Sequence, residues 1–302
     1  MTTLRILRAG PLTTLQDAGR PGHLRHGISA AGPMDRAAFR RTGAWLGGAG
    51  ATAIEFTTAG LGLRVEGGAV GCALDGGQFT LRRNGETLAW PARLHLEDGD
   101  VVDIAPGPAG NYGYLRLGRE IDVPLVLGSR ATSLVSRLGG LEGRELRAGD
   151  VLHLGDAVAP LPALHPRATP AGAGPVRVLW GLHADLFEAG VRRRFIEETF
   201  LVSPHIDRMG ARLEDQAGVF AGAQILSLVS DAVVPGDIQI LGDGTPIVLM
   251  RDHQPTGGYP RIATVIDADL DRMAQLRPGA HVRFAPVTLA EAHAALRGGA
   301  AP

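Results

Sequence analysis

Hydrophobic and polar residues alternate along most of the chain in short runs. A period of two residues is the pattern of strands that bury one face. Residues 79–88 alternate around Asn84-Gly85, a dipeptide that supplies the positive φ angles of a type I′ hairpin turn. Other short runs predict strands over Leu94–Ile104 (around Asp98-Gly99), Glu145–Leu154, Arg177–Trp180, Gln224–Val229, Ile238–Leu241, Ile247–Met250, Ile262–Ile266 and His281–Phe284.

Helical patterns are few. In residues 184–200, Phe187, Val191 and Phe195 recur along one side, as in a helix that packs on a core. A capping box, Thr288 followed by Glu291 three residues later, opens the pattern near the end of the chain. The predicted helices are Asp35–Leu46, Ala184–Phe200, Asp269–Gln275 and Thr288–Leu296.

The pattern predicts two β-rich halves. A chain of 302 residues fits two domains of about 150 residues each. Residues 159–175 are rich in proline and small residues and have no apolar period, which is typical of a linker. Many short strands favour barrels or sandwiches over a doubly wound sheet. We therefore expect a mainly β protein with a few short helices, an N-terminal β-barrel domain at 1–158 and a C-terminal one at 176–302.

Composition excludes several activities. The net charge is -1, so no global field attracts nucleic acid or an anionic membrane. All thirty basic residues are arginine, and without lysine the chain has no Walker A phosphate loop and forms no lysine Schiff base. It also has no lysine on which to carry biotin. Biotin would therefore act here only if a partner presented it.

One cysteine and the absence of long apolar stretches suggest the compartment. Cys72 lies in the apolar run Ala69–Leu74 and has no second cysteine to pair with, which suits a reducing cytoplasm. We expect it to be a core residue, not a nucleophile. No signal-peptide pattern opens the sequence, and no window approaches 18 apolar residues. The expected location is cytoplasmic, with no membrane contact.

Two further classes of site are disfavoured by spacing. The ten histidines form no HExxH motif, and a single cysteine cannot form CxxC, so no metal is expected. Ser129 lies in a GSRAT sequence, which lacks the second glycine of a serine-hydrolase elbow.

Four glycine-rich stretches place polar residues beside flexible backbone: 13–22, 32–36, 203–212 and 252–260. Glycine lets the backbone approach a ligand closely. For any one stretch alone, an ordinary turn with solvated charges is the better interpretation, and four such stretches in one chain weaken that interpretation. Asp207-Arg208 is the pair best suited to catalysis, because an arginine holds a carboxylate bidentately and an aspartate accepts a proton. The alternative is a surface salt bridge between the two, worth at most about 1 kcal/mol.

Six ordered segments resemble the biotin-dependent carboxyltransferase family. This family includes the C subunit of 5-oxoprolinase, proteins similar to the second component of allophanate hydrolase, an antagonist of a sporulation-kinase inhibitor, and the carboxyltransferase region of urea carboxylase. The segments are TTLQDAGRPG (13–22), GPMDRAAF (32–39), residues 126–150, VSPHIDRMGARLE (202–214), VVPGDIQILGDGTPIVLM (233–250) and TGGYPRIATVIDADL (256–270).

The resemblance implies a fold, a complex and a set of site residues. The fold would be two cyclophilin-like β-barrel domains facing a shared cleft. The chain would act with the A and B subunits of an ATP-dependent 5-oxoprolinase on a small lactam or amide, opening 5-oxo-L-proline to L-glutamate, with ATP bound mainly by one of the other subunits. The catalytic residues would be Asp207 and Arg208, and the substrate-binding residues Gln16, Asp17, Asp35, Arg212, Gln239, Gln254, Thr256, Gly257, Gly258 and Tyr259.

Some positions depart from the family pattern, and two other functions stay open. The departures are Gly43, Gly48, Gln78, His205, Ile206 and Ala211. At positions 43, 48 and 206 hydrogen-bonding side chains of the family are lost, which allows another substrate. One alternative is a carboxyltransferase proper that takes carboxybiotin from a separate carrier. The other is a regulatory protein that binds a kinase inhibitor and needs no intact catalytic cleft.

Overall fold

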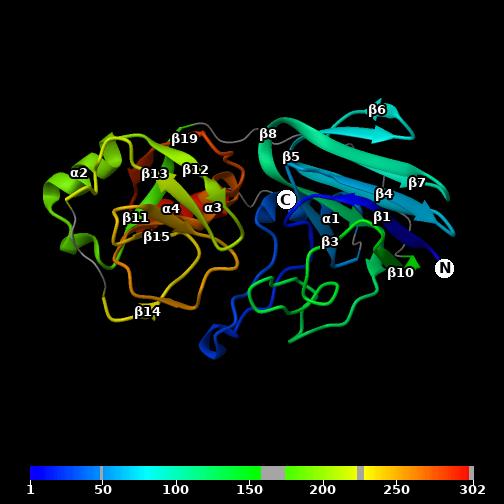
Figure 1. Cartoon of the computed structure of the whole chain (residues 1–302), viewed down its shortest axis with the longest axis horizontal. Coiled ribbons are helices and arrows are strands. Elements are labelled where there is room, and N and C mark those ends of the chain that lie inside the picture. The colour runs from blue at the N-terminus through cyan, green and yellow to red at the C-terminus, as the bar shows by residue number, and fades with distance from the viewer. Residues whose placement is uncertain (48–49, 158–173, 223–227, 299–302) are drawn as a thin grey trace. The chain divides into compact units, whose positions relative to one another are not determined.

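The computed structural model describes residues 1–47, 50–157, 174–222 and 228–298. The chain forms two compact units, one comprising Met1–His23 and Ala30–Pro170 and the other Leu24–Ser29 and Ala171–Pro302. Each unit has its own large sheet (Figure 1). With 42% strand and 15% helix, the mainly β fold class is confirmed. Most of the predicted linker lies outside the described residues, so the domain boundaries at 158 and 176 stay predictions.

The first unit is a ten-stranded sheet with one long helix. Its path runs β2-β3-β8-β4-β1-β10-β9, and β5 pairs with β6, β7 and β8. The strands are β1 (Thr3–Ala9), β2 (Thr14–Gln16), β3 (Ala53–Thr57), β4 (Leu61–Glu66), β5 (Val70–Arg83), β6 (Glu86–Leu88), β7 (Ala92–Leu96), β8 (Val101–Leu117), β9 (Arg119–Ile121) and β10 (Val151–Ala157), with helices η1 (Leu24–His26) and α1 (Arg36–Trp45). The three-residue η1 falls in the segment assigned to the second unit.

The β5–β6 hairpin confirms the turn predicted from the sequence. Arg83 pairs with Glu86 across the turn. Asn84 and Gly85 have φ angles of 52° and 87°, the left-handed values that a type I′ turn requires.

Alternation builds the core of the first unit. On β1, Leu4 and Ile6 are fully buried while Arg5 between them pairs with Glu66 at the surface. Leu63 and Val65 of β4 are also fully buried. Apolar area removed from water in this way stabilises the fold by about 25 cal/mol per Å².

The second unit is an eight-stranded sheet in the order β19-β12-β13-β16-β15-β18-β11-β20, with a separate β14-β17 ribbon. Only Arg283 separates the two edge strands along the chain, so the sheet edges come together and the barrel nearly closes. The elements are β11 (Val176–Trp180), η2 (Ala184–Leu186), α2 (Ala189–Glu197), β12 (Phe200–Ile206), β13 (Gly210–Glu214), β14 (Asp231–Ala232), β15 (Asp237–Ile240), β16 (Pro246–Leu249), β17 (Thr256–Gly257), β18 (Arg261–Val265), α3 (Asp267–Ala274), β19 (His281–Val282), β20 (Phe284–Pro286) and α4 (Leu289–Gly298).

Aromatic rings fill part of this second core. Phe195 of α2 stacks on Phe284 of β20, with ring centroids 4.9 Å apart. Phe200 and Phe220 pack against the Phe195 ring, at 5.9 and 6.2 Å. The buried face of the short α2 is thus held by residues distant in sequence.

The predicted helix over Ala184–Phe200 is wrong in extent. The segment forms η2 and α2, and Phe187 and Glu188 between them have extended ψ angles of 135° and 149°. Phe200 already begins β12, so tertiary pairing overrides the helical period there. The stretch 203–212, expected as a loop, lies mostly on β12 and β13.

Other predictions differ in detail. The strand predicted from Glu145 begins only at Val151, because Arg147 and Asp150 form a turn before it. The helix predicted from Asp269 begins at Asp267. The capping box is confirmed, since Thr288 Oγ1 accepts from the Glu291 amide at 3.2 Å and Glu291 accepts from the Thr288 amide at 2.7 Å. The strand predicted over Gln224–Val229 falls mainly on 223–227, which lie outside the described residues.

Candidate functional site

The predicted substrate residues at the N-terminus are tied into the first unit. Gln16, at the end of β2, donates to Thr14 Oγ1 and the Thr132 carbonyl, and its own oxygen accepts from the Gly32 amide at 3.1 Å. Asp17 accepts from the amides of Gly19 and Arg130 and from the Ser129 hydroxyl, at 2.5–2.8 Å. These bonds join stretch 13–22 to the loop that follows β9. Both side chains fix the loops, and neither is more than 7% exposed.

Asp35 begins helix α1. Its carboxylate accepts from the Ala38 amide at 2.8 Å, the bond of an N-cap. Its own amide donates to the Tyr114 hydroxyl, which donates in turn to Glu55 at 2.7 Å. Burial and the nearby carboxylates raise the pKa of Tyr114 well above its usual value. The phenol therefore stays protonated and serves as a structural donor.

Arg208 and Asp207 do not form a pair. The Arg208 guanidinium makes a bidentate ion pair with Asp252, at 2.9 and 3.0 Å, and both side chains are at most 2% exposed. Asp207 is exposed and accepts from the amides of Met209 and Gly210, at 2.7 and 3.0 Å. The arginine expected to hold a ligand thus already holds a carboxylate of the fold, and the expected surface salt bridge between the neighbours is not formed.

Two of the predicted C-terminal residues, Gln254 and Gly257, lie against a third, Gln239. Gln254 donates its amide to Gln239 Oε1 at 3.1 Å. A Cβ on Gly257 would lie 2.4 Å from Gln239 Nε2, so only glycine allows this approach. Gln239 is 1% exposed, and its Nε2 has no hydrogen-bond partner among the described residues.

The remaining predicted residues lie on and beside the β14–β17 ribbon. Ala232 pairs with Thr256, and the Gly258 carbonyl accepts from the Leu228 amide at 2.6 Å. Thr256 is exposed, and Tyr259 is 39% exposed. These side chains are available to a ligand or a partner. The catalytic and substrate roles expected for all of these residues stay predictions.

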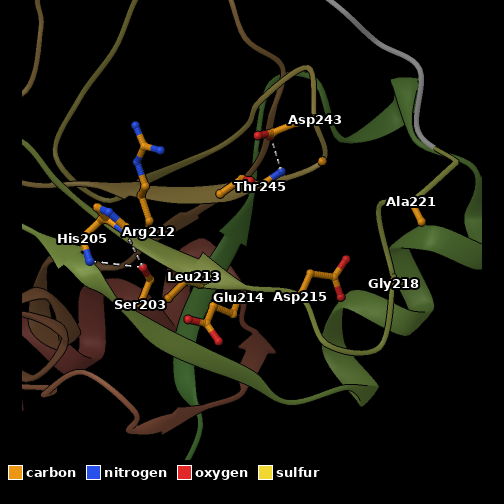
Figure 2. A pocket seen from close by; sticks show the side chains of 11 residues that line it. Ser203, His205, Arg212, Leu213, Glu214, Asp215, Gly218, Ala221, Asp243 and Thr245 are labelled. Atoms are coloured by element: carbon orange, nitrogen blue, oxygen red, sulfur yellow. Dashed lines mark hydrogen bonds between the residues drawn. The ribbon is translucent and has the colours of Figure 1, made fainter.

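A pocket of about 350 Å³ opens on the second unit (Figure 2). It lies beside β12, β13 and the turn between β15 and β16. Arg212 is the one predicted substrate residue in it. The other polar residues of its lining include Ser203, His205, Glu214, Asp215, Asp243 and Thr245.

The pocket walls follow from strand geometry. Arg212 and Glu214 alternate with the buried Ala211 and Leu213, so both leave the exposed face of β13. The Ser203 hydroxyl lies 3.2 Å from His205 Nδ1 and accepts from the His205 amide at 3.1 Å. The Asp243 carboxylate accepts from the Thr245 amide at 2.9 Å. Hydrogen bonds from the Thr245 amide and hydroxyl, with a smaller effect of Arg212, lower the pKa of Asp243.

The pocket is suited to binding a small polar molecule. Within the described part of the chain, no carboxylate bonds to His205, so the Ser203–His205 contact is not completed to a Ser-His-acid triad. The described residues also contain no cluster of three or more His, Cys, Asp or Glu able to hold a metal. Among the residues that line the pocket, the sequence assigned a substrate role to Arg212 alone and singled out His205 only as a departure from the family pattern. The signal was present, since all of the polar ones except Asp215 lie inside the quoted segments 202–214 and 233–250.

The residues that depart from the family pattern lie in different structural environments. A Cβ on Gly43 would lie 2.2 Å from Arg116 Nη1, so the missing side chain leaves room for that guanidinium. Gln78 sits exposed at an irregularity of the β5–β8 pairing. Ile206 pairs with Ala211 where β12 meets β13. His205 lines the pocket, and Gly48 lies outside the described residues.

The two barrel-type β units, one of them with a pocket lined by polar residues, define a mainly β protein. The chain belongs to the carboxyltransferase domain family, subdomain A and B, whose family model matches residues 26–286. This confirms the family predicted from the six segments.

Several similar proteins match nearly the whole length of the chain. It is 35% identical to the C subunit of 5-oxoprolinase from Escherichia coli over 96% of this chain and 93% of the relative. Identity to the same subunit from Haemophilus influenzae is 33%, over 95% and 92%. It is 31% identical to the urea amidolyase of Lachancea kluyveri over 92% of this chain but only 16% of that protein.

Solved structures agree with the fold. The Kluyveromyces lactis urea amidolyase superposes with a TM-score of 0.87 at 26% identity, over 99% of this chain and 20% of that one. The urea carboxylase of the same yeast gives 0.86 at 27% identity, over 99% and 29%. The chain therefore corresponds to about a fifth to a third of these larger proteins. No helix in the described residues is long and apolar enough to cross a membrane.

Proposed function

We propose that this chain is the C subunit of an ATP-dependent 5-oxoprolinase, which opens 5-oxo-L-proline to L-glutamate together with the A and B subunits in the cytoplasm. The observation that best supports this proposal is the 35% identity to the C subunit of the Escherichia coli 5-oxoprolinase over nearly the full length of both chains. A match of this extent covers nearly all of both units.

The composition of this chain and its pocket support a division of the reaction among the subunits, with ATP bound elsewhere. It has no lysine for a phosphate loop, and in its pocket three carboxylates (Glu214, Asp215 and Asp243) oppose a single arginine. Such a site repels a triphosphate. We therefore assign ATP mainly to one of the other subunits.

Reconstitution tests the proposal. The chain is mixed with the A and B subunits from the same organism, and glutamate release from 5-oxo-L-proline is measured with and without ATP. Release that needs ATP and all three proteins is the expected result. Stable assembly without any turnover would contradict the enzymatic function and favour a regulator of a partner protein.

Asp207 can be tested inside that assay. Asp207→Asn removes the charge but keeps an oxygen for the Met209 and Gly210 amides, so the turn is retained. If Asp207 is catalytic, turnover is lost while the complex still assembles. Asp122→Asn, at an exposed aspartate outside the site, is the matched control. Unchanged turnover in Asp207→Asn would remove this residue from the catalytic set.

A second candidate is a carboxyltransferase component similar to that of urea carboxylase. The observation that favours it is the TM-score of 0.86 to the yeast urea carboxylase. Without lysine, this chain would need a separate biotinylated carrier. Transfer of labelled carboxylate from such a carrier to an amide would support it, and ATP-dependent glutamate release in the absence of biotin would exclude it.

A further inference from the structure

The pocket on β12 and β13 has a charge arrangement that selects a particular ligand class. We propose that it binds a small α-amino acid as a zwitterion, with Arg212 taking the carboxylate and Asp243 the ammonium group. The ligand class follows from the pocket alone. Only the choice of glutamate as the physiological ligand rests on the proposed function.

Arg212 is positioned to receive a carboxylate. It stands on the exposed face of β13 and lines the pocket, and it makes no ion pair with any of the described residues. In Figure 2 its guanidinium extends from the strand on the same side as Asp243. A guanidinium offers two parallel donors that match the two oxygens of a carboxylate.

Asp243 supplies the opposite charge. The turn before β16 fixes this carboxylate, because Asp243 accepts from the Thr245 amide at 2.9 Å. Arg212 contributes to the lowered pKa of Asp243, yet the two side chains are more than 4.0 Å apart and form no ion pair. The two charges therefore act on each other across a space that a ligand can enter.

The balance of charge rules out simpler ligands. Glu214, Asp215 and Asp243 outnumber Arg212, so a molecule with a carboxylate alone meets net repulsion. A simple cation leaves the arginine without a partner. A zwitterion satisfies both groups at once, and the volume of about 350 Å³ is at the small end of ligand pockets.

This deepens the proposed function on its product side. L-Glutamate carries an α-ammonium group, an α-carboxylate and a side-chain carboxylate, whereas in 5-oxo-L-proline the same nitrogen is part of a neutral lactam, so only glutamate offers a cation to Asp243. The pocket should thus prefer the product over the substrate. It would hold the amino acid that the complex releases, and not the lactam that it opens.

Direct titration of the isolated full-length chain tests this. The ligands are L-glutamate, L-alanine, 5-oxo-L-proline, acetate and methylammonium, measured by calorimetry or by NMR shifts. We expect both amino acids to bind and the other three to bind at least about tenfold more weakly, because each lacks one charged partner. Arg212→Gln and Asp243→Asn should each weaken amino-acid binding by about tenfold or more.

Two variants serve as controls for this titration, and two outcomes would contradict the proposal. Arg193→Gln and Glu197→Gln, at exposed positions of α2, should leave binding unchanged. If 5-oxo-L-proline or acetate bound as tightly as the amino acids, the proposed preference for a zwitterionic ligand would be wrong. No amino-acid binding, or binding unaffected by Arg212→Gln in a folded protein, would overturn the site. Neither result depends on the A and B subunits or on ATP, so failure here is distinct from failure of the reconstituted complex.

Discussion

At the scale of single residues, the buried ion pair between Arg208 and Asp252 is the most consequential contact. Both side chains have left water, and their two hydrogen bonds at 2.9 and 3.0 Å compensate for the loss of hydration. The resemblance implies a catalytic role for Arg208, which stays a prediction. Its burial makes it a structural anchor for the segments that precede β13 and follow β16.

Breaking this pair should destabilise the protein strongly. Asp252→Asn removes the carboxylate charge that pairs bidentately with the buried Arg208 guanidinium, and breaking such a buried ion pair costs about 3–5 kcal/mol. Urea unfolding followed by circular dichroism measures the change. Asp185→Asn, which breaks an ion pair whose aspartate is 96% exposed, is the control and should barely alter stability. The double variant Arg208→Met/Asp252→Leu should recover part of the loss, and equal losses in single and double variants would contradict the argument.

A second pair gives a pH signature. Arg144 binds Asp150 bidentately at 2.8 and 3.0 Å, and this contact lowers the pKa of Asp150 from its ordinary 3.8, although partial burial opposes the shift. A lowered folded pKa contributes stability above the unfolded value and loses it as pH falls through the folded one.

The expected result is a pH-dependent difference in melting temperature. Wild type should exceed Asp150→Asn most near neutral pH, and the gap should shrink as the pH falls below about 3.8. Thermal melts at a series of pH values measure it. Asp122→Asn, at an exposed aspartate, should show a flat difference, and a gap in Asp150→Asn that widened in acid would contradict the sign.

At the scale of elements, helix α1 depends on a missing side chain. The Arg116 guanidinium lies 4.5 Å from the ring centroid of Phe39 and donates to the Gly50 carbonyl at 2.7 Å. It occupies the place where a side chain on Gly43 would be. Glycine inside a helix ordinarily costs about 1 kcal/mol relative to alanine. Here the arginine contacts offset that cost.

Gly43→Ala should therefore fail to stabilise the protein. The new Cβ would displace Arg116, and the lost contacts outweigh the gain of about 1 kcal/mol in helix propensity. In an Arg116→Ala background the same substitution should stabilise. Chemical denaturation of the four proteins of this cycle gives the coupling. Gly190→Ala, at a helix position with open space around it, is the matched control and should stabilise in the wild type.

Local signals in the sequence were sufficient for some elements and insufficient for others. Asn84-Gly85 and Thr288–Glu291 were predictable because their bonds join near neighbours. The split of 184–200 was not, because β12 forms by pairing with β13 and β19. The pocket was predicted only in part for the same reason. Arg212 could be named from the sequence, but strand register, not a motif, brings it beside the Asp243 turn. The burial of Arg208 against Asp252, 44 residues away, left no local signal at all.

At the scale of the whole molecule, the reactivity of the single cysteine can be used to follow unfolding of the first unit. Cys72 is fully buried on β5, and burial raises the pKa of its thiol to about 12. A thiol of that kind is inert, since the thiolate is the reactive form. The sequence prediction of a core cysteine is confirmed.

Thiol labelling should thus measure opening of that unit. In native protein at pH 8 we expect no reaction with a thiol reagent on the timescale of minutes, and one equivalent of reaction in 6 M guanidinium chloride (roughly the concentration that unfolds most domains). Fast labelling of the native chain would place Cys72 at the surface. Buried Leu74→Ala, two residues along β5, should speed labelling by loosening the same core.

The near closure of the second barrel has a kinetic consequence. The sheet that nearly closes includes three parallel pairs between β11 and β20, which join Val176 to Phe284, positions about 100 residues apart. The chain must give up the entropy of that long loop before this pairing yields any contact, and such topologies fold slowly. We therefore expect this pairing to form late in the assembly of the barrel. A nascent or unfolding molecule would expose β11 and β20 as open edges at which neighbouring chains could join.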